Sequence, residues 1–264
     1  MSLSVFGSST FCVVTGASQG IGQAVALHLA PKFGSNSVMV LTARNGTNLD
    51  ETKAQIVTKA PNVEVRCVVG DLGNQETIAK VAAECFDSVT PDTFQHAIIV
   101  QCAGSLGDLV YIRDLNNAVD IQKEMLLNVT SAFVLTPKFL NTFQKSDSLR
   151  RTVINISSLA AIQPVKSWGL YCTTKAGRDM VFKVVAEEEQ DVRVLNWAPG
   201  PVRTIMITKC TEDSADADTR QMMRDARDSN MVLTCDQTCE MLMHVIEKDE
   251  FKSGDHVDYF DVKK

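Results

Sequence analysis

Short apolar runs alternate with longer amphipathic segments along the chain. Continuous runs rich in Val, Ile and Leu are typical of strands that are buried on both faces of a parallel sheet. Between the runs lie helical patterns, the first of which starts near Gly20 and presents Ile21, Val25 and Leu29 on one face. Repeated strand–helix units joined by right-handed crossovers predict an α/β fold: a doubly wound parallel sheet of the Rossmann type with helices on both faces. The runs are Phe11–Thr15, Val38–Ala43, Val63–Val69, Ala97–Cys102, Thr152–Ile156 and Val192–Trp197.

Two stretches break this alternation. Residues 103–120 are predicted to form a loop that enters a helix, and residues 199–234 form an acidic, Met-rich insertion. Ligands of open α/β sheets bind beyond the carboxyl ends of the strands. The insertion is therefore either a lid over a substrate or a surface loop. Neither stretch has the composition of a linker, so we expect residues 1–264 to form a single domain.

The charge and the cysteines narrow the classes of partner. The net charge is −6, which favours neither nucleic acid nor an anionic membrane surface. The eight cysteines form no Cys-x2-Cys pair and no set with histidines that zinc would need, so we expect reduced thiols and no metal. The N-terminus lacks a basic segment followed by a long apolar run, which indicates a cytoplasmic protein.

A glycine-rich segment follows the first predicted strand directly. Glycines between a buried strand and an amphipathic helix allow a tight turn and a close approach of the backbone to a pyrophosphate. The N-terminus of the helix adds free N–H groups and a partial positive charge. The segment therefore predicts a dinucleotide site, formed by Gly16, Ser18, Gln19, Gly20, Ile21 and Gly22.

The end of the second predicted strand indicates which dinucleotide binds. An NAD site would place an acid there, about 20 residues beyond the glycines, to bind the 2′-hydroxyl of the ribose. This chain has Arg44 at that place, followed by Asn45, and its next acid is Asp50. A guanidinium binds a 2′-phosphate through two parallel hydrogen bonds, whereas an acid would repel it. We therefore expect NADP, used as NADPH in a reduction.

Three polar residues near the fifth predicted strand carry the candidate chemistry. Ser158 follows this strand, Tyr171 comes thirteen residues later, and Lys175 lies four residues further on, which places Tyr171 and Lys175 on one face of a helix. Reduction of a carbonyl needs a proton donor for the oxygen. A lysine ammonium about 4 Å from a tyrosine would lower the tyrosine pKa from about 10 by up to about three units. We predict Tyr171 as the general acid, Lys175 as the group that tunes its pKa, and Ser158 as a hydrogen-bond donor to the carbonyl oxygen.

The glycine spacing Gly-x3-Gly-x-Gly, together with the spacing of Ser158, Tyr171 and Lys175, resembles the short-chain dehydrogenase/reductase family. The resemblance implies that Asn128 holds a water beside Lys175 in a proton relay; the alternative is a structural hydrogen bond. It also implies that long helices around residues 117–143 and 168–189 pair two subunits into a homodimer. The implied cofactor contacts beyond the glycines and Arg44 are Asn45, Asp71, Leu72, Ala103, Gly104, Tyr171, Lys175, Pro199, Gly200, Val202 and Thr204. Of these, Asp71 has an alternative role as a cap of the helix that follows.

This chain departs from the family pattern at two positions. Many NADP-using relatives carry a basic residue where this chain has Gln19, so we expect weaker discrimination against NAD. The family usually has an asparagine where this chain has Cys102, and that asparagine tethers the neighbouring backbone. We expect Cys102 to lower the local order without removing a catalytic group.

Two less common stretches, Ala103–Asp108 and Glu247–Asp258, resemble the sepiapterin reductases within this family. This resemblance implies reduction of the C6 side-chain carbonyls of sepiapterin and 6-pyruvoyl-tetrahydropterin, the last step towards tetrahydrobiopterin. It also implies that Asp258 anchors the pterin, with Asp255 and Asp261 as rivals. A carboxylate suits this role because it accepts two parallel N–H bonds from an aminopyrimidine. The implied substrate site comprises Ser158, Tyr171, Gly200 and Asp258, with Leu106, Trp168 and Met206 as pocket walls or as core residues.

Two other functions fit the sequence. A reductase of broad specificity for dicarbonyls or quinones would use the same three residues, and only Asp258 would distinguish it. A catalytically idle NADP-binding protein that reports the cofactor level to a partner would have no use for an activated tyrosine.

Overall fold

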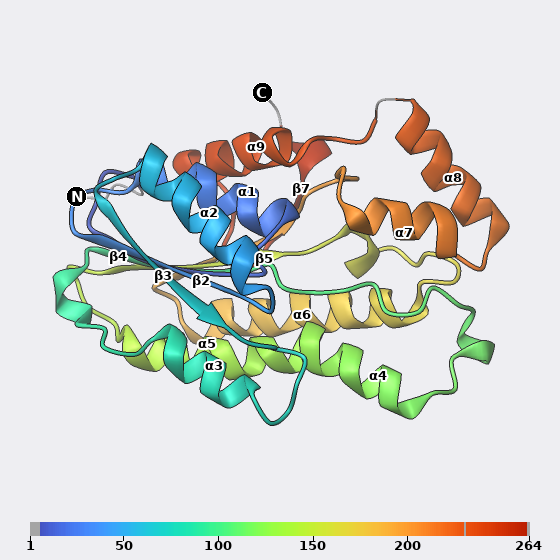
Figure 1. Ribbon diagram of the computed structural model, residues 1–264, viewed down its shortest axis with the longest axis horizontal. Helices are drawn as coiled ribbons and strands as arrows, with labels where there is room; N and C mark the ends of the chain where they lie inside the picture. Colours follow the sequence, from blue (N-terminus) through green and yellow to red (C-terminus); the bar gives the residue numbers. More distant parts are fainter. Residues whose placement is uncertain (1–5, 230, 263–264) are drawn as a thin grey trace.

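The computed structural model describes residues 6–229 and 231–262. Within these residues, seven strands form one sheet in the order β3-β2-β1-β4-β5-β6-β7, and all neighbouring strands are parallel. The doubly wound fold is therefore confirmed (Figure 1), and the first six strands coincide with the predicted apolar runs to within two residues at each end. The strands are β1 (Thr10–Thr15), β2 (Ser37–Ala43), β3 (Val63–Val69), β4 (His96–Gln101), β5 (Arg150–Ile156), β6 (Val192–Ala198) and β7 (His256–Asp258).

Helices cover both faces of the sheet (Figure 1). One face carries α1 (Gly20–Leu29), α2 (Gly46–Lys59) and α9 (Cys235–Lys248). The other face carries α3 (Ile78–Cys85), α4 (Ala118–Met125), α5 (Ser131–Thr142) and α6 (Gly169–Glu188). The insertion after β6 contains α7 (Ile205–Asp213) and α8 (Ala217–Asp228), which lie together beyond one end of the sheet. No helix in the described part of the chain combines the length and apolar character needed to cross a bilayer.

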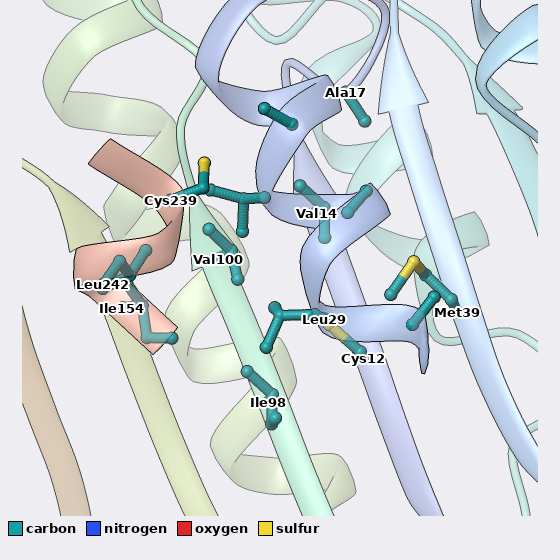
Figure 2. Packing of buried hydrophobic residues seen from close by; sticks show 14 of the residues in the cluster. Cys12, Val14, Ala17, Leu29, Met39, Ile98, Val100, Ile154, Cys239 and Leu242 are labelled. Atoms are coloured by element: carbon teal, nitrogen blue, oxygen red, sulfur yellow. The ribbon is translucent and has the colours of Figure 1, made fainter. Parts of the chain in front are cut away.

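The core lies in two layers because successive strand residues point to opposite faces. Cys12 and Val14 of β1 belong to the core layer under α1 and α9, where Cys12 lies beside Leu29 of α1 (Figure 2). Phe11 belongs to the core on the other face, against α3, α5 and α6. Burial of one large apolar side chain stabilises a fold by roughly 1.5–3 kcal/mol. The strands buried on both faces therefore hold the carboxyl edge of the sheet, and the loops that leave it, in fixed positions.

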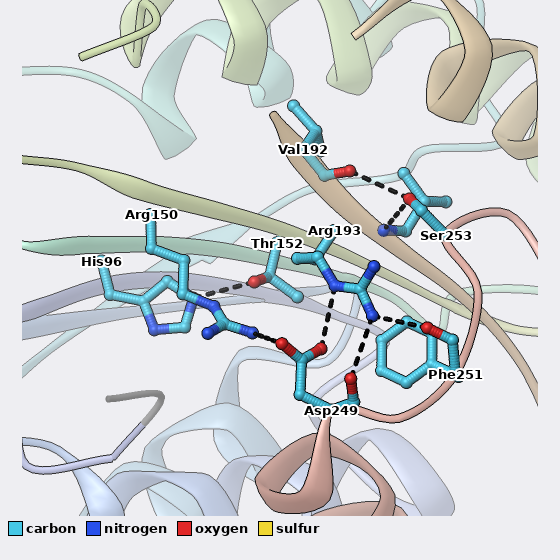
Figure 3. Close-up of polar contacts among 9 residues, drawn as sticks. His96, Arg150, Thr152, Val192, Arg193, Asp249, Phe251 and Ser253 are labelled. Atoms are coloured by element: carbon cyan, nitrogen blue, oxygen red, sulfur yellow. Dashed lines mark hydrogen bonds and ion pairs between the residues drawn. The ribbon is translucent and has the colours of Figure 1, made fainter. Parts of the chain in front are cut away.

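The amino-terminal ends of β5 and β6 are hydrogen-bonded to the segment that leads from α9 into β7 (Figure 3). Asp249 ends α9 in the left-handed conformation, with φ at 53°. Its carboxylate accepts hydrogen bonds from Arg150 Nη2 and Arg193 Nε, each at 2.8 Å. Ser253 Oγ accepts a bond from the backbone N–H of Val194 at 3.0 Å. These contacts fix the start of β7, a strand of three residues at the edge of the sheet.

Candidate active site

The glycine segment between β1 and α1 has the geometry of a phosphate cradle. Gly16 and Gly20 have φ values of +67° and +59°, which favour glycine. A Cβ on Gly22 would run into the carbonyl oxygen of Gly16. The helix N-cap, Gln19, makes no side-chain cap bond, so no side chain caps the first N–H groups of α1. Ser18 and Ile21 line the same turn half-buried, and the segment fits a pyrophosphate.

The residues expected around the adenosine half of the cofactor follow β2 and β3. Arg44 directly follows β2, is exposed, and has no ion-pair partner among the described residues. Asn45 caps α2, since its side chain accepts a bond from the backbone N–H of Asn48 at 3.1 Å. The free guanidinium of Arg44 therefore fits a phosphate, whereas the side-chain oxygen of Asn45 is already engaged in the fold.

Asp71 lies in the turn between β3 and α3. Its Oδ1 accepts a hydrogen bond from the backbone N–H of Gly73 at 2.8 Å. The N-cap of α3 is Thr77, so the alternative role of Asp71 as the cap of this helix is wrong. The neighbouring Leu72 is buried at 4% exposure in the core under α3. Asp71 remains half-buried at the carboxyl edge of the sheet, where an adenine contact is predicted.

Two polar side chains hold the backbone that follows β4. Thr15 Oγ1 accepts hydrogen bonds from the N–H groups of Cys102 at 2.9 Å and Ala103 at 3.0 Å. Arg178 of α6 donates to the carbonyl oxygen of Ala103 at 2.7 Å and to that of Gln101. The segment is therefore tethered although Cys102 stands where relatives have asparagine; the expected loss of local order stays a prediction. Sequence reasoning missed Thr15 and Arg178; the available signal was that Arg178 lies one helical turn beyond Lys175.

The structure brings Ser158, Tyr171 and Lys175 together at the end of β5. Tyr171 is 7% exposed, and the hydroxyl of Ser158 lies close enough to its own hydroxyl to lower the pKa of Tyr171. Lys175 Nζ donates to the carbonyl oxygen of Ile156 at 2.7 Å and lies 5.7 Å from the centre of the Tyr171 ring. A carbonyl that approaches this point would meet two hydroxyl donors and, behind the tyrosine, an amine.

Burial dominates the protonation of these groups. It raises the pKa of Tyr171 to about 12, against a smaller lowering by the bond to Ser158. Burial, with a smaller contribution from the positive charge of Arg178, lowers the pKa of Lys175 to about 7. Our expectation that Lys175 depresses the tyrosine pKa is therefore not met in this structure, because the cost of burying either charge exceeds their attraction. A phenol that stays protonated at neutral pH is the form that donates a proton.

Asn128 lies in a π-helical turn, Leu126–Thr130, that joins α4 to α5. Its Oδ1 accepts from the backbone N–H of Ser105 at 3.0 Å, and its Nδ2 donates to Ser105 O at 3.0 Å and Thr174 Oγ1 at 3.3 Å. A Cβ on Gly104 would clash with Asn128 Oδ1, so only glycine allows this approach. The structural role left open for Asn128 is thus present: it fastens the loop after β4 to α6. Its part in a proton relay stays a prediction.

The segment after β6 runs back towards the glycine cradle. Gly200 has a φ of +71°, and the ring of Phe260 lies 3.2 Å from the place a Cβ would take. Val202 is buried, and Thr204, the N-cap of α7, has its methyl group 3.4 Å from the Cβ position of Gly20. Pro199 begins the segment and its carbonyl oxygen accepts a bond from Thr238 Oγ1 at 3.0 Å. The segment therefore closes one side of the predicted nicotinamide site.

The carboxylate expected to anchor the substrate lies at the end of β7. Asp258 is 8% exposed, whereas its rivals Asp255 and Asp261 are exposed. Its Oδ1 accepts a bond from the backbone N–H of Phe260 at 2.9 Å. Val257 packs against the core beneath α1 and α9, so by strand alternation Asp258 points to the face that carries α6 and Tyr171.

The predicted walls lie around the tyrosine. Leu106, Trp168 and Tyr171 belong to one buried cluster, and Met206 of α7 packs against it. The rings of Trp168 and Tyr171 meet edge to face, with their centres 6.1 Å apart. Met223 of α8 packs against the same cluster. The insertion after β6 is therefore a folded pair of helices that covers the tyrosine, which favours the lid over the surface loop.

Comparisons with known proteins agree with this geometry. The family model described as short chain dehydrogenase matches residues 10–215. The chain is 38% identical to sepiapterin reductase of Xenopus tropicalis over 255 residues, which is 96% of this chain and 97% of that protein. It is 37% identical to sepiapterin reductase of Rattus norvegicus, over 95% of this chain and 96% of that protein. A benzil reductase of Bacillus cereus that forms (S)-benzoin is 28% identical over 93% of this chain and 97% of that protein.

Solved structures share the fold. The KRED1-Pglu enzyme superposes with a TM-score of 0.78 at 23% identity, over 94% of this chain and all of that one. A short chain dehydrogenase from Shigella flexneri, complexed with NADP, gives a TM-score of 0.74 at 24% identity, over 94% and 96% of the two chains.

The chain belongs to the short-chain dehydrogenase family. It is an oxidoreductase that uses a nicotinamide cofactor, and within the family it resembles sepiapterin reductase.

Proposed function

We propose that this protein reduces the side-chain carbonyls of pterins, among them sepiapterin and 6-pyruvoyl-tetrahydropterin, with NADPH as the reductant, in the biosynthesis of tetrahydrobiopterin. The observation that carries the proposal is the pair of groups on one face of the sheet. Tyr171 of α6, the proposed proton donor, lies beside the end of β5, and Asp258 lies at the end of β7 as a buried carboxylate. The similarity to sepiapterin reductases over nearly the full chain supports the same substrate.

The cofactor site is proposed from the cradle and the cation beside it. Gly16, Gly20 and Gly22 would hold the pyrophosphate at the N-terminus of α1, and Arg44 would hold the 2′-phosphate. Asp71 would contact the adenine. The reduced nicotinamide, when bound, supplies the hydride for the carbonyl carbon.

The reaction then depends on what the side chains of this chain do. Ser158 donates a hydrogen bond to the carbonyl oxygen and holds it beside Tyr171. Tyr171 donates the proton that the oxygen takes up. Lys175, whose pKa of about 7 leaves it partly protonated at neutral pH, returns a proton towards the phenol. Trp168 and Met206 keep water away from this point, since they pack around the tyrosine.

The position of Asp258 would determine which carbonyl of the substrate reaches Tyr171. A carboxylate accepts two N–H bonds from the amino-pyrimidine edge of a pterin, so Asp258 would fix the bicyclic ring. The C6 side chain would then extend towards Ser158 and Tyr171. We propose further that residues 1–264 act as one domain, as a homodimer in the cytoplasm. The eight free thiols of the chain support a reducing compartment.

The test follows NADPH absorbance with purified protein, sepiapterin and, separately, a small diketone such as diacetyl. The proposal predicts turnover of sepiapterin with NADPH, and a rise in its KM of about tenfold or more in Asp258→Ala while the KM for diacetyl stays within about twofold. Asp255→Ala is the matched control because Asp255 is exposed and three residues away. Brisk reduction of diacetyl without any turnover of sepiapterin would contradict the pterin assignment.

A second candidate function is a broad reductase of dicarbonyls. The similarity to a benzil reductase favours it, although at 28% identity the support is weaker. In that case Asp258→Ala would leave the KM of every substrate unchanged, because a small dicarbonyl needs only Ser158 and Tyr171.

A further inference from the structure

A buried carboxylate that the proposed reaction does not use joins three parts of the site. Asp179 lies on α6, one helical turn beyond Lys175, and its side chain is 3% exposed. Its Oδ1 accepts hydrogen bonds from Asn155 Nδ2 at 3.0 Å and from Ser157 Oγ at 2.5 Å. Its Oδ2 accepts from His256 Nδ1 at 2.7 Å. A buried carboxylate with three side-chain donors is a rigid junction, because each lost donor leaves a buried charge less compensated.

On one side, this junction fixes the catalytic end of β5. Asn155 and Ser157 flank Ile156, whose carbonyl oxygen accepts the hydrogen bond from Lys175 Nζ at 2.7 Å. Ser158 comes next along the chain. Asp179 therefore holds the same short segment that carries the acceptor for the lysine and the proposed donor to the substrate.

On the other side, the junction fixes β7. This strand has only three residues and pairs only with β6, where His256 lies opposite Asn196 and Asp258 opposite Ala198. The side chain of His256 is 8% exposed. Its Nε2 is buried and has no hydrogen-bond partner in the part of the chain that the structure describes. The bond to Asp179 is thus the one polar restraint on this side chain among those residues.

Because His256 and Asp258 lie on the same short strand, the hydrogen bond between His256 and Asp179 also restrains the position of Asp258. Residues two apart on a strand point to the same face, so His256 and Asp258 both point towards α6. The distance from His256 to Asp258 is fixed by the strand, and the distance from Asp179 to Tyr171 is fixed by the helix. The bond between His256 and Asp179 joins the two elements.

We propose that Asp179 and His256 form a positioning pair that sets where Asp258 stands relative to Ser158 and Tyr171, and that the pair thereby determines the affinity for substrates long enough to reach both ends of the site. The inference rests on the proposed function, since it needs a substrate that Asp258 anchors. A shift of about 1 Å in a group that orients a substrate is enough to lower turnover efficiency by about a hundredfold.

Two variants of His256 separate positioning from simple stability. His256→Leu keeps much of the volume and removes the donor to Asp179. His256→Asn places an amide N–H near the position of Nδ1 and keeps the donor. We expect His256→Leu to raise the KM for sepiapterin about tenfold or more, with kcat within about threefold and the KM for diacetyl unchanged. His256→Asn is expected to restore the KM to within about threefold of the wild type.

The control and the double variant complete the test. His28→Leu removes another histidine–aspartate contact, that with Asp236 on the opposite face, and should change neither KM. If His256 acts through Asp258, the double variant His256→Leu/Asp258→Ala has the same KM for sepiapterin as Asp258→Ala alone. NADPH affinity, measured by fluorescence titration, should be the same in all these variants.

The outcomes are distinguishable. Suppose first that the wild type turns over sepiapterin. The positioning pair is then overturned by any one of three results: equal rises of KM for sepiapterin and diacetyl in His256→Leu, no rescue by His256→Asn, or additive effects in the double variant. An absence of sepiapterin turnover by the wild type would instead refute the proposed function, and the inference with it.

Discussion

At the scale of single residues, the proposed preference for NADPH over NADH rests on one cation. Arg44 is exposed, follows β2 directly, and has no ion-pair partner among the described residues. No second basic residue supports it in the glycine turn, where Gln19 stands. Selectivity for NADPH over NADH should therefore change with Arg44 alone.

We predict that Arg44→Ala raises the KM for NADPH by about tenfold to a hundredfold, the worth of a charge-assisted hydrogen-bond pair, and leaves the KM for NADH within about twofold. Steady-state kinetics with both cofactors measures this. Arg66→Ala, which removes a surface arginine paired with Glu64 on β3, is the control. Equal changes for the two cofactors would show that Arg44 does not read the 2′-phosphate.

Lys175 predicts a pH dependence of stability. Burial lowers its pKa to about 7 from an ordinary 10.5, so between these values the unfolded chain binds a proton that the folded chain does not. Stability therefore rises with pH from about 7 to about 10.5 through this group, because the cost of burying the ammonium is full below about pH 7 and disappears above about pH 10.5. Lys175→Met removes the dependence. Urea unfolding of both proteins at several pH values measures the difference in free energy, and a difference that does not change with pH would refute the pKa.

At the scale of elements, the parts predicted best from the sequence are those with the strongest pattern. The six long strands are continuous apolar runs, and their ends agree closely because burial on both faces demands such a run. β7 escaped prediction because His256–Asp258 is only three residues long and two of its side chains are polar. The sequence pattern did not predict the two helices of the insertion either, because α8 is largely polar and buries little of its surface.

The site was predicted only where its residues are close in sequence or belong to a motif. Tyr171 and Lys175 follow from a helical step of four, and Ser158 from the end of a strand. The partners of Arg178 lie 75 and 77 positions away, and His256 lies 77 positions from Asp179. Such pairs form only after the sheet brings distant strand ends together, so local patterns do not reveal them.

Two glycines in helices differ in whether the surrounding structure leaves room for a side chain. A Cβ on Gly22 of α1 would meet the carbonyl oxygen of Gly16, whereas a Cβ on Gly177 of α6 has its nearest neighbour, Val129, at 3.9 Å. Gly177→Ala should therefore raise stability by about 0.5–1 kcal/mol through a lower entropy of the unfolded chain. Gly22→Ala should lower both stability and NADPH affinity. Thermal unfolding and fluorescence titration measure these effects, and equal behaviour of the two variants would contradict the cradle.

At the scale of the whole molecule, exposed apolar side chains gather on the helices opposite α1, α2 and α9. Phe133 of α5 is 59% exposed, and Met180 and Val184 of α6 are 57% and 44% exposed. Neighbouring apolar side chains in water are unfavourable unless another surface covers them. A second copy of the chain is the proposed partner, in line with the homodimer that the family resemblance implies.

We predict that Phe133→Asp converts the proposed homodimer to monomer, since a carboxylate would be buried in the proposed interface without a partner. Sedimentation velocity at micromolar concentration measures the change. Val57→Asp is the control, because Val57 is 45% exposed on α2 of the opposite layer. A wild-type protein that sediments as a monomer would contradict the dimer.

The proposed reaction depends most on Tyr171 as the proton donor to a pterin carbonyl, and one set of kinetic measurements tests this role directly. Wild-type protein, Tyr171→Phe and the control Tyr111→Phe are mixed with NADPH and sepiapterin, and the decay of NADPH absorbance is followed. We predict that Tyr171→Phe lowers kcat by about a hundredfold or more while its NADPH affinity stays within a few-fold, and that Tyr111→Phe retains its kcat. Sepiapterin reduction by Tyr171→Phe at the wild-type rate would contradict the role of Tyr171 as the proton donor.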